Sequence, residues 1–252
     1  MNISAEELRR EYEELEKSGF PLGWAMDYGS KLGESREIEL HFELVLEDYK
    51  RPRPKRWHPE DFFRLHRDDG VLYLSRMLTS EDEERAVGAA YLMAELLPRA
   101  RYRNHEELTG ELIGALVSLA GSDEPEHRRK CIIALGWVGA EREIPLLREH
   151  LKGDPDTLCR AWSASSFLQM SGRVPEDIMK KETRGALIDC IEHENDVFVR
   201  GVAVETVQYI WNVKLGLRGS AVEDRNQKAV NRAARRALEY LASENGGSGA
   251  VD

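Results

Sequence analysis

The chain has 252 residues, of which 41% are hydrophobic and 33% are charged, and its formal net charge at pH 7 is −10. Its longest apolar runs are far shorter than the roughly 20 residues that a membrane-spanning helix requires, so we expect no membrane span. The first residues lack the basic and apolar regions of a secretory signal peptide, which favours a cytoplasmic protein. The excess of acidic residues disfavours non-specific binding to nucleic acid, because such binding depends on cations that contact phosphate.

Three cysteines occur without Cys-x-x-Cys spacing, so neither a disulfide framework nor a zinc knuckle is predicted. We expect Cys131, Cys159 and Cys190 to pack as small core residues, because each lies in an apolar helical pattern. The chain has no Gly-rich phosphate loop, no G-x-S-x-G elbow and no H-E-x-x-H motif. We therefore expect no metal and no cofactor, and the motifs do not identify an enzyme.

The N-terminal segment begins with a helix signal. Ser4 and Glu7 form the S-x-x-E pattern of a capping box, which predicts a helix from about Ala5. The sequence Gly19-Phe20-Pro21 should end this helix. Glycines and serines interrupt residues 22–35, for which we predict a loop or a short irregular helix.

Residues 38–46 are compatible with two structures. Apolar residues alternate with polar ones, which is the period of a half-buried strand, but Ile38, Phe42 and Val45 also follow the spacing of a helix. No second segment offers a strand to pair with, and a lone strand leaves its backbone groups without partners. We favour a helix, whereas a strand would imply an irregular subdomain or an exposed sheet edge.

Prolines and charge suggest where the parts of the chain divide. Residues 50–57 are basic and rich in proline, which predicts an extended segment and a boundary. Ser220 with Glu223 predicts one final helix that runs to about residue 243. We expect an N-terminal cap over 1–57, helical repeats over 58–216, a C-terminal capping helix over 217–244 and a disordered tail over 245–252.

The repeats share one phrase, in which a leucine opens an apolar run, a turn follows, and an arginine 13 residues after the leucine opens a second apolar run. This pattern predicts a helix, a tight turn and a second helix in each repeat. The four pairs of leucine and arginine are Leu72 with Arg85, Leu116 with Arg129, Leu147 with Arg160, and Leu187 with Arg200.

The phrase that starts at Arg129, Arg-x-x-x-x-Ala-Leu-Gly-x-x-Gly, is followed by Ile144-Pro145-Leu146-Leu147 and by Gly153-Asp154-Pro155-Asp156. It resembles the short HEAT repeat of bacterial proteins, the type also found in PBS-lyase-type proteins, over about residues 70–216. The resemblance implies an all-α fold, an α-α superhelix or HEAT-like solenoid of about four helix pairs with a concave wall. It also implies that the repeat arginines and nearby aspartates bridge neighbouring repeats, namely Arg85, Arg129, Arg160 and Arg200 with Asp123, Asp154 and Asp196.

Some proteins with HEAT-like repeats are enzymes, and their motifs are not found here. Deoxyhypusine hydroxylases carry His-Glu pairs just after the repeat arginine, where this chain has other residues such as Lys130-Cys131 and Ala161-Trp162. Alkylpurine DNA glycosylases require a basic concave groove with aromatic residues and a carboxylate. Trp137, Trp162 and Trp211 either belong to the core or line such a wall, and Arg99, Arg101 and Arg103 form one of three basic clusters.

We favour a non-catalytic scaffold that binds a partner protein, of unknown identity, on its concave face. A HEAT-like nucleic-acid binder or alkylpurine DNA glycosylase is one alternative, which the acidic net charge disfavours. Another is an immunity or antitoxin-like protein that masks a basic toxin, and a third is an assembly factor for a pigment or cofactor protein. A scaffold of this type hosts many functions, so the fold does not decide among them.

Overall fold

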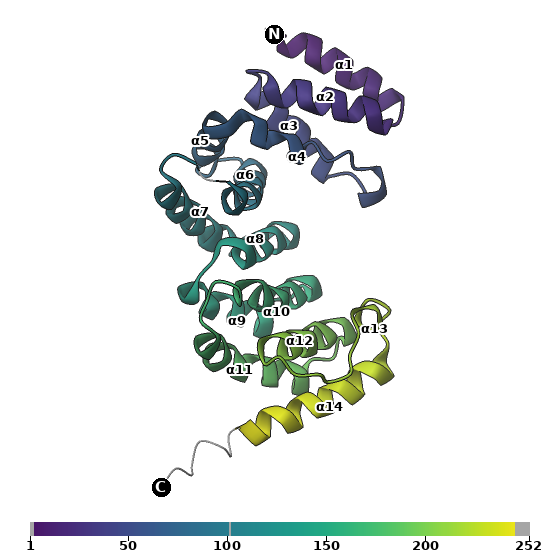
Figure 1. Cartoon of the computed structure of the whole chain (residues 1–252), viewed down its shortest axis with the longest axis vertical. Helices are drawn as coiled ribbons and strands as arrows, with labels where there is room; N and C mark the ends of the chain where they lie inside the picture. Colours follow the sequence, from purple (N-terminus) through teal and green to yellow (C-terminus); the bar gives the residue numbers. More distant parts are fainter. Residues whose placement is uncertain (1–2, 101, 245–252) are drawn as a thin grey trace. The chain divides into compact units, whose positions relative to one another are not determined.

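A computed structural model gives the structure of the chain and describes residues 3–100 and 102–244 (Figure 1). Every regular element within these residues is a helix, so the predicted all-α fold is confirmed. The chain divides into two compact units, Met1–Ala115 and Leu116–Asp252. No helix of the described residues is long and apolar enough to cross a membrane.

The first unit begins with helix α1, Ala5–Lys17, and its predicted capping box is present. The Ser4 hydroxyl accepts a hydrogen bond from the Glu7 amide at 3.3 Å, and the Glu7 carboxylate accepts one from the Ser4 amide at 3.0 Å. Gly19 ends the helix as predicted, because its φ of +78° is a conformation that residues with a side chain rarely adopt. Leu8, Leu15 and other apolar residues of α1 are buried in the core of this unit.

The prediction for residues 22–35 is wrong, since Leu22–Glu34 forms a regular helix, α2. The glycines that suggested a break are contact positions. A Cβ atom on Gly29 would lie 2.4 Å from a ring carbon of Phe62, and one on Gly33 would lie 2.5 Å from the Phe62 carbonyl oxygen. The cost of glycine in a helix is accepted here because only glycine lets the following segment approach so closely.

Residues 38–46 are helical, as favoured, and belong to α3, Ile38–Tyr49. The proline-rich segment that follows contains a short 3-10 turn, η1, Arg53–Lys55, and is otherwise irregular. It is fastened by the buried carboxylate of Asp48, which accepts hydrogen bonds from the Trp57 amide at 3.1 Å and from Arg56 Nε at 3.0 Å. The basic segment is therefore held against α3 by a partly buried ion pair.

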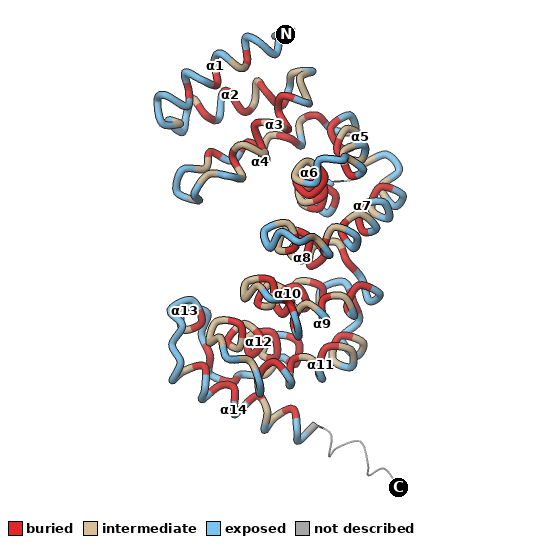
Figure 2. The backbone as a smooth tube through the Cα atoms, turned by 180° about the vertical axis from the view of Figure 1, so that it is seen from behind, coloured by how far each residue is buried: buried red, intermediate tan, exposed pale blue. Residues whose placement is uncertain are grey.

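The rest of the first unit contains α4 (Glu60–Phe63), η2 (Arg64–His66), α5 (Arg67–Met77), α6 (Glu83–Leu96) and η3 (Leu97–Arg99). The boundary between the units, after Ala115, falls within α7 (His105–Leu119). Most of α6 is buried, as Figure 2 shows. Small residues make this burial possible, because Ala86, Ala89 and Ala90 let neighbouring helices pack closely on several sides.

The second unit contains α8 (Pro125–Val138), η4 (Glu141–Glu143), α9 (Ile144–Gly153), α10 (Thr157–Met170), α11 (Glu176–His193) and α12 (Val197–Ile210). Helix α10 packs between α8 and α12, and α9 lies behind it against α11. We call α8, α10 and α12 the second-helix layer, since each is the second helix of its repeat. Helix pairs thus occur where the repeated phrase predicts them.

The predicted single C-terminal helix from Ser220 is wrong, because two helices are present, α13 (Gly219–Glu223) and α14 (Gln227–Glu244). Arg225 adopts a positive φ of 49° between them, and Asn226 starts α14 by accepting a hydrogen bond from the Ala229 amide at 3.1 Å. Helix α14 packs on α11 and α12 and buries Val230 and Leu241 among others. The predicted tail, residues 245–252, lies outside the described residues.

Candidate functional site

The helices of the second-helix layer share one register, which their N-caps define. The N-cap residues are Glu124, Asp156 and Asp196, and in each case the residue two positions earlier accepts a hydrogen bond from the N-cap amide through its side chain. These accepting residues are Ser122, Asp154 and Glu194. The fourth residue of each helix is an arginine: Arg128, Arg160 and Arg200.

Arg128 joins two successive turns. Its Nη1 donates to the carbonyl oxygens of Ser122 and Asp123 at 2.8 and 3.0 Å in its own turn. Its Nε and Nη2 donate to both carboxylate oxygens of Asp154, in the next turn, at 2.9 and 2.8 Å. Burial alone would raise the pKa of Asp154, but hydrogen bonds from Arg128, the Asp156 amide and His150 lower it to about 2.

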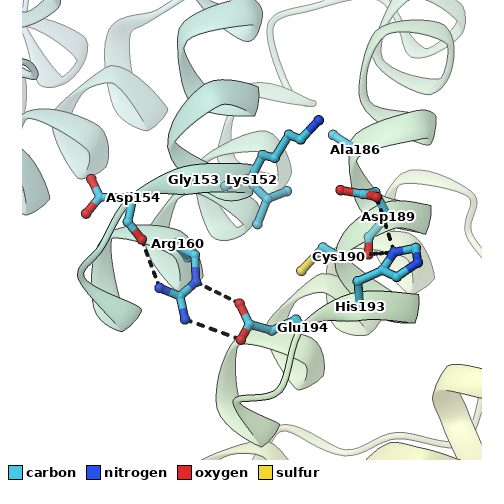
Figure 3. Close-up of a pocket in the computed structure, with 10 residues that line it drawn as sticks. Lys152, Gly153, Asp154, Arg160, Ala186, Asp189, Cys190, His193 and Glu194 are labelled. Carbon is cyan, nitrogen blue, oxygen red and sulfur yellow. Dashed lines mark hydrogen bonds and ion pairs between the residues drawn. The ribbon is translucent and has the colours of Figure 1, made fainter.

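Arg160 repeats this arrangement one turn further on. Its Nη1 donates to the Asp154 carbonyl oxygen at 2.8 Å, and its Nε and Nη2 donate to the Glu194 carboxylate at 2.7 and 3.2 Å (Figure 3). Arg200 continues the series with a hydrogen bond to the side chain of Asn231 on α14. Arg128 and Arg160 therefore each tie their own repeat to the one that follows, and Arg200 ties the last repeat to α14.

The members of this series differ in part from the predicted ones. In the first central repeat the buried, bidentate arginine is Arg128, whereas Arg129 is half-buried and lies 3.5 Å from Asp156. Asp123 contributes a carbonyl oxygen rather than its carboxylate. Asp196 is an N-cap and pairs with Arg225 at 3.0 Å. The structure thus puts Arg128, one residue earlier, in the place predicted for Arg129. Asp154 is equivalent to Glu194, and Asp196 is equivalent to Asp156, so the two predicted aspartates hold positions two residues apart in their repeats.

Arg85 belongs to the first unit and has different partners. Its Nη2 donates to the Tyr73 hydroxyl at 3.2 Å and to Glu39 at 3.4 Å. It is the third residue of α6, after the N-cap Asp82, and Ala86 stands where the second unit has its arginines. Arg85 therefore connects neighbouring helices, but not by the two-turn contact of Arg128 and Arg160.

An apolar stripe runs across the second-helix layer. Positions 2, 6, 9 and 13 of α8, α10 and α12 are all intermediate or exposed, whereas positions 7, 8, 10 and 11 of these helices are buried, so the first set points away from the helices packed behind. Seven of these twelve positions are apolar or aromatic, and Tyr209 is the most accessible with 61% of its surface exposed. We call them the aromatic stripe: Ile133 and Trp137 on α8, Leu158 and Trp162 on α10, and Phe198, Val202 and Tyr209 on α12.

The predicted tryptophans separate into two groups. Trp137 and Trp162 are half-buried members of the aromatic stripe. Trp211 retains only 4% of its exposed surface and ends α12, so it is a core residue and not part of this face. Of the two alternatives expected for the tryptophans, Trp211 therefore follows the first, a place in the core.

A cavity of about 210 Å³ lies at the α13 end of the aromatic stripe. Trp162 and Phe198 contribute their rings, and Glu205 and Glu223 contribute carboxylates. Burial raises the pKa of Glu205, and the nearby negative charge of Glu223 raises it further. This is an aromatic and acidic cavity, and Glu205 has no ion pair with any residue that the structure describes.

A second cavity, of about 230 Å³, lies between α9 and α11 and is polar (Figure 3). Its Arg160 and Glu194 are paired with each other, and His193 lies 3.2 Å from Asp189. Burial raises the pKa of the Cys190 thiol to about 12, so this cysteine is not an activated nucleophile. Over residues 3–100 and 102–244, no group of three or more His, Cys, Asp or Glu side chains could hold a metal ion.

Several cations in the basic clusters of the first unit lie near carboxylates. Lys50 lies 2.8 Å from Glu84, and Arg51 pairs with Glu16. Arg99 is exposed and lies 3.7 Å from Glu95. Arg103 is also exposed, with its Nε 4.0 Å from Asp68, and Arg101 lies outside the described residues. Carboxylates therefore pair with Lys50 and Arg51, whereas Arg99 and Arg103 remain largely exposed beside theirs.

The geometry defines an all-helical repeat protein whose repeats are joined by arginines at equivalent positions. A model of the HEAT repeats family matches residues 71–167, which confirms the resemblance to HEAT repeats. Such repeats generally mediate protein–protein interaction. No curated protein matches the chain. A solved structure described as the crystal structure of an engineered protein is similar, with 20% identity, a TM-score of 0.49, and coverage of 85% of this chain and 95% of that chain.

Sequence reasoning missed Leu158, Phe198, Tyr209 and Glu205. Their common signal is position, because all lie at residues 2, 9 or 13 after an acidic N-cap. That register becomes visible once the helix starts are aligned on the N-caps Glu124, Asp156 and Asp196, because the predicted Arg129 is one residue out of it.

Proposed function

We propose that this protein is a non-catalytic HEAT-repeat scaffold of the cytoplasm that binds a partner protein through the aromatic stripe, the concave face of its repeats. The observation that carries the proposal is that each of three successive helices leaves two or three apolar side chains accessible at positions of this shared register. Folding gains nothing from exposing Tyr209 or from leaving Trp162 half-covered, whereas protein interfaces are rich in tyrosine and tryptophan.

The dimensions of the site support a protein partner rather than a small molecule. The cavity of about 210 Å³ is smaller than the roughly 300–1,000 Å³ that is typical of small-molecule sites. It would hold a single side chain of a partner whose remaining contacts lie along the stripe. Anchoring of this kind, with one side chain in a pocket and flatter contacts around it, is common at protein interfaces.

The proposal is tested by affinity purification from native lysate with nuclease treatment, followed by titration of the recovered protein against variants. Tyr209→Ser removes an exposed ring of the stripe, and Trp162→Ser removes a half-buried one. We expect each to weaken binding about 30-fold, which corresponds to about 2 kcal/mol for a central interface residue. The matched control is Val117→Ser, which removes an exposed apolar side chain of α7 outside the stripe.

Equal affinity of all three variants for the recovered protein would refute the use of this face. Loss of recovery on nuclease treatment would instead favour the nucleic-acid alternative. The ion pairs of Lys50, Arg51 and Arg99 argue against that alternative, because a cation that is already paired releases fewer counterions from nucleic acid.

A further inference from the structure

We propose that the cavity at the α13 end of the aromatic stripe recognises one lysine or arginine side chain of the partner protein. This inference rests on the proposed function and names the chemistry of the partner, a segment in which a basic residue stands among apolar ones.

The walls of the cavity are apolar where a hydrocarbon stem would lie. Ala161 comes from α10, Val202 from α12 and Val222 from α13. Lysine and arginine bury the methylene groups of their side chains against such surfaces while the charged end remains near polar groups. A cavity of about 210 Å³ therefore suits one long side chain.

The carboxylates provide the partner for the charged end. Glu205 is half-buried and has no hydrogen bond or ion pair with the residues that the structure describes, and Glu223 stands on the α13 side of the same cavity. The Glu205 carboxylate extends towards α13, since a Cβ atom on Gly219 would lie 3.4 Å from its Oε1. A partly buried charge without a counter-charge is unfavourable, and a cation of the partner would supply that counter-charge.

The aromatic rings add a second attraction for a cation. Trp162 and Phe198 line the cavity, and the negative face of an aromatic ring attracts ammonium and guanidinium groups. Phe198 already makes such a contact, because the Arg225 guanidinium lies 5.4 Å from its ring centroid. Asp196 neutralises Arg225 at 3.0 Å, and neither Arg225 nor Arg218 lines the cavity. The cavity itself therefore stays acidic.

The α13 wall is held in place before any partner binds. Gln208 of α12 accepts hydrogen bonds from the Leu215 and Leu217 amides at 3.0 and 3.2 Å, and it donates to the Leu217 carbonyl at 3.2 Å. Val222 then packs on Gly201, where a Cβ atom would lie 2.9 Å from its side chain. A preformed pocket loses less conformational entropy on binding than a flexible one.

The test is selection of peptides from a random 12-residue display library on the full-length protein. We expect enrichment of peptides that carry a lysine or arginine flanked by apolar residues. Glu205→Gln should weaken binding of a selected peptide about 10- to 100-fold, as expected for loss of a charged hydrogen bond. Replacing its basic residue with norleucine should have a similar effect. Glu239→Gln on α14, an exposed carboxylate outside the cavity, is the matched control and should leave affinity unchanged.

The outcomes separate this inference from the proposed function. Peptides that lose affinity with Tyr209→Ser but not with Glu205→Gln, or that contain no basic residue, would overturn recognition of a basic side chain by the cavity and leave the stripe as the binding face. Peptides insensitive to both variants, or no enrichment at all, would overturn both. An unfolding midpoint in urea that is no lower for each variant than for wild type would exclude misfolding as the cause of a loss.

Discussion

The ion pair of Arg128 and Asp154 allows a stability prediction for the second unit. Asp154→Asn keeps the size of the side chain but removes its charge, while Arg128 keeps only 8% of its surface exposed. Removing one partner of a buried ion pair costs about 3–5 kcal/mol, because the other charge remains buried without compensation. A typical domain is stable by about 5–15 kcal/mol, so the effect should be large.

The pair of Arg160 and Glu194 is the internal comparison. It has the same bidentate geometry, but its side chains are 17% and 11% exposed, against 9% and 1% for Arg128 and Asp154. Solvent compensates an orphaned charge better at the more exposed site, so Glu194→Gln should cost less, about 1–3 kcal/mol. Urea unfolding followed by circular dichroism would measure both free energies, with the slope of the transition as a check on the unfolded surface.

The pH dependence gives an independent check. The pKa of Asp154 is lowered from its usual 3.8 to about 2 in the folded protein, so its stabilising charge is present above about pH 3.8 and lost as the pH falls towards 2. The advantage of wild type over Asp154→Asn should be constant down to about pH 4 and shrink below it. A cost under about 1 kcal/mol for Asp154→Asn, or a larger cost for Glu194→Gln, would refute this reasoning.

Three further predictions concern single positions. Gly29→Ala should destabilise the first unit by about 1–3 kcal/mol in urea unfolding because its Cβ atom meets an aromatic ring, whereas Gly23→Ala, with nothing within 4 Å, should not destabilise it. Burial lowers the pKa of His41 to about 3 and of His66 to about 4, so both stay neutral in the folded protein while they take up protons in the unfolded chain below pH 6.5. The free energy of unfolding of the first unit should therefore fall below pH 6.5 by up to about 1.4 kcal/mol per pH unit for each histidine. An unfolding midpoint that stays constant from pH 7 to 5 would contradict this. Glu205→Gln should raise the melting temperature at pH 7, because the pKa of the Glu205 carboxyl is raised in the folded state and its charge therefore opposes folding. The gain should vanish at acidic pH, where Glu205 of the wild type is protonated. Equal melting temperatures of the two proteins at pH 7 would contradict this.

Local sequence signals predicted the helices well where one contact decides the structure. Ser4 and Glu7 are three residues apart, and their mutual hydrogen bonds depend on nothing outside that turn. The helical period of Ile38, Phe42 and Val45 likewise outweighed the alternation, because no partner strand was available. The repeated leucine and arginine likewise located the helix pairs, because the signal lies within one helix-turn-helix phrase of the sequence.

Signals failed where a distant contact overrides the local preference. Gly29 and Gly33 read as breaks, but their absence of side chains is required by Phe62, which is remote in sequence. The choice between Arg128 and Arg129 could not be made from two adjacent arginines, since only the packing of the turns decides which one is buried. Similarly, α12 is apolar on most sides, so its accessible face becomes known only once α10, α11 and α14 are packed against it.

The series of arginines makes the repeats dependent on one another in one direction along the chain. Arg128 needs the carboxylate of the following turn, Arg160 needs the next, and Arg200 needs Asn231 of α14. Truncation from the C-terminus would therefore leave an unsatisfied cation at each new end. An inserted repeat, by contrast, would bring both a carboxylate for the repeat before it and an arginine for the one after. Such an array can be lengthened in its interior by duplication without changes to the neighbouring repeats. Removal of its last helix would instead leave Arg200 without its partner Asn231.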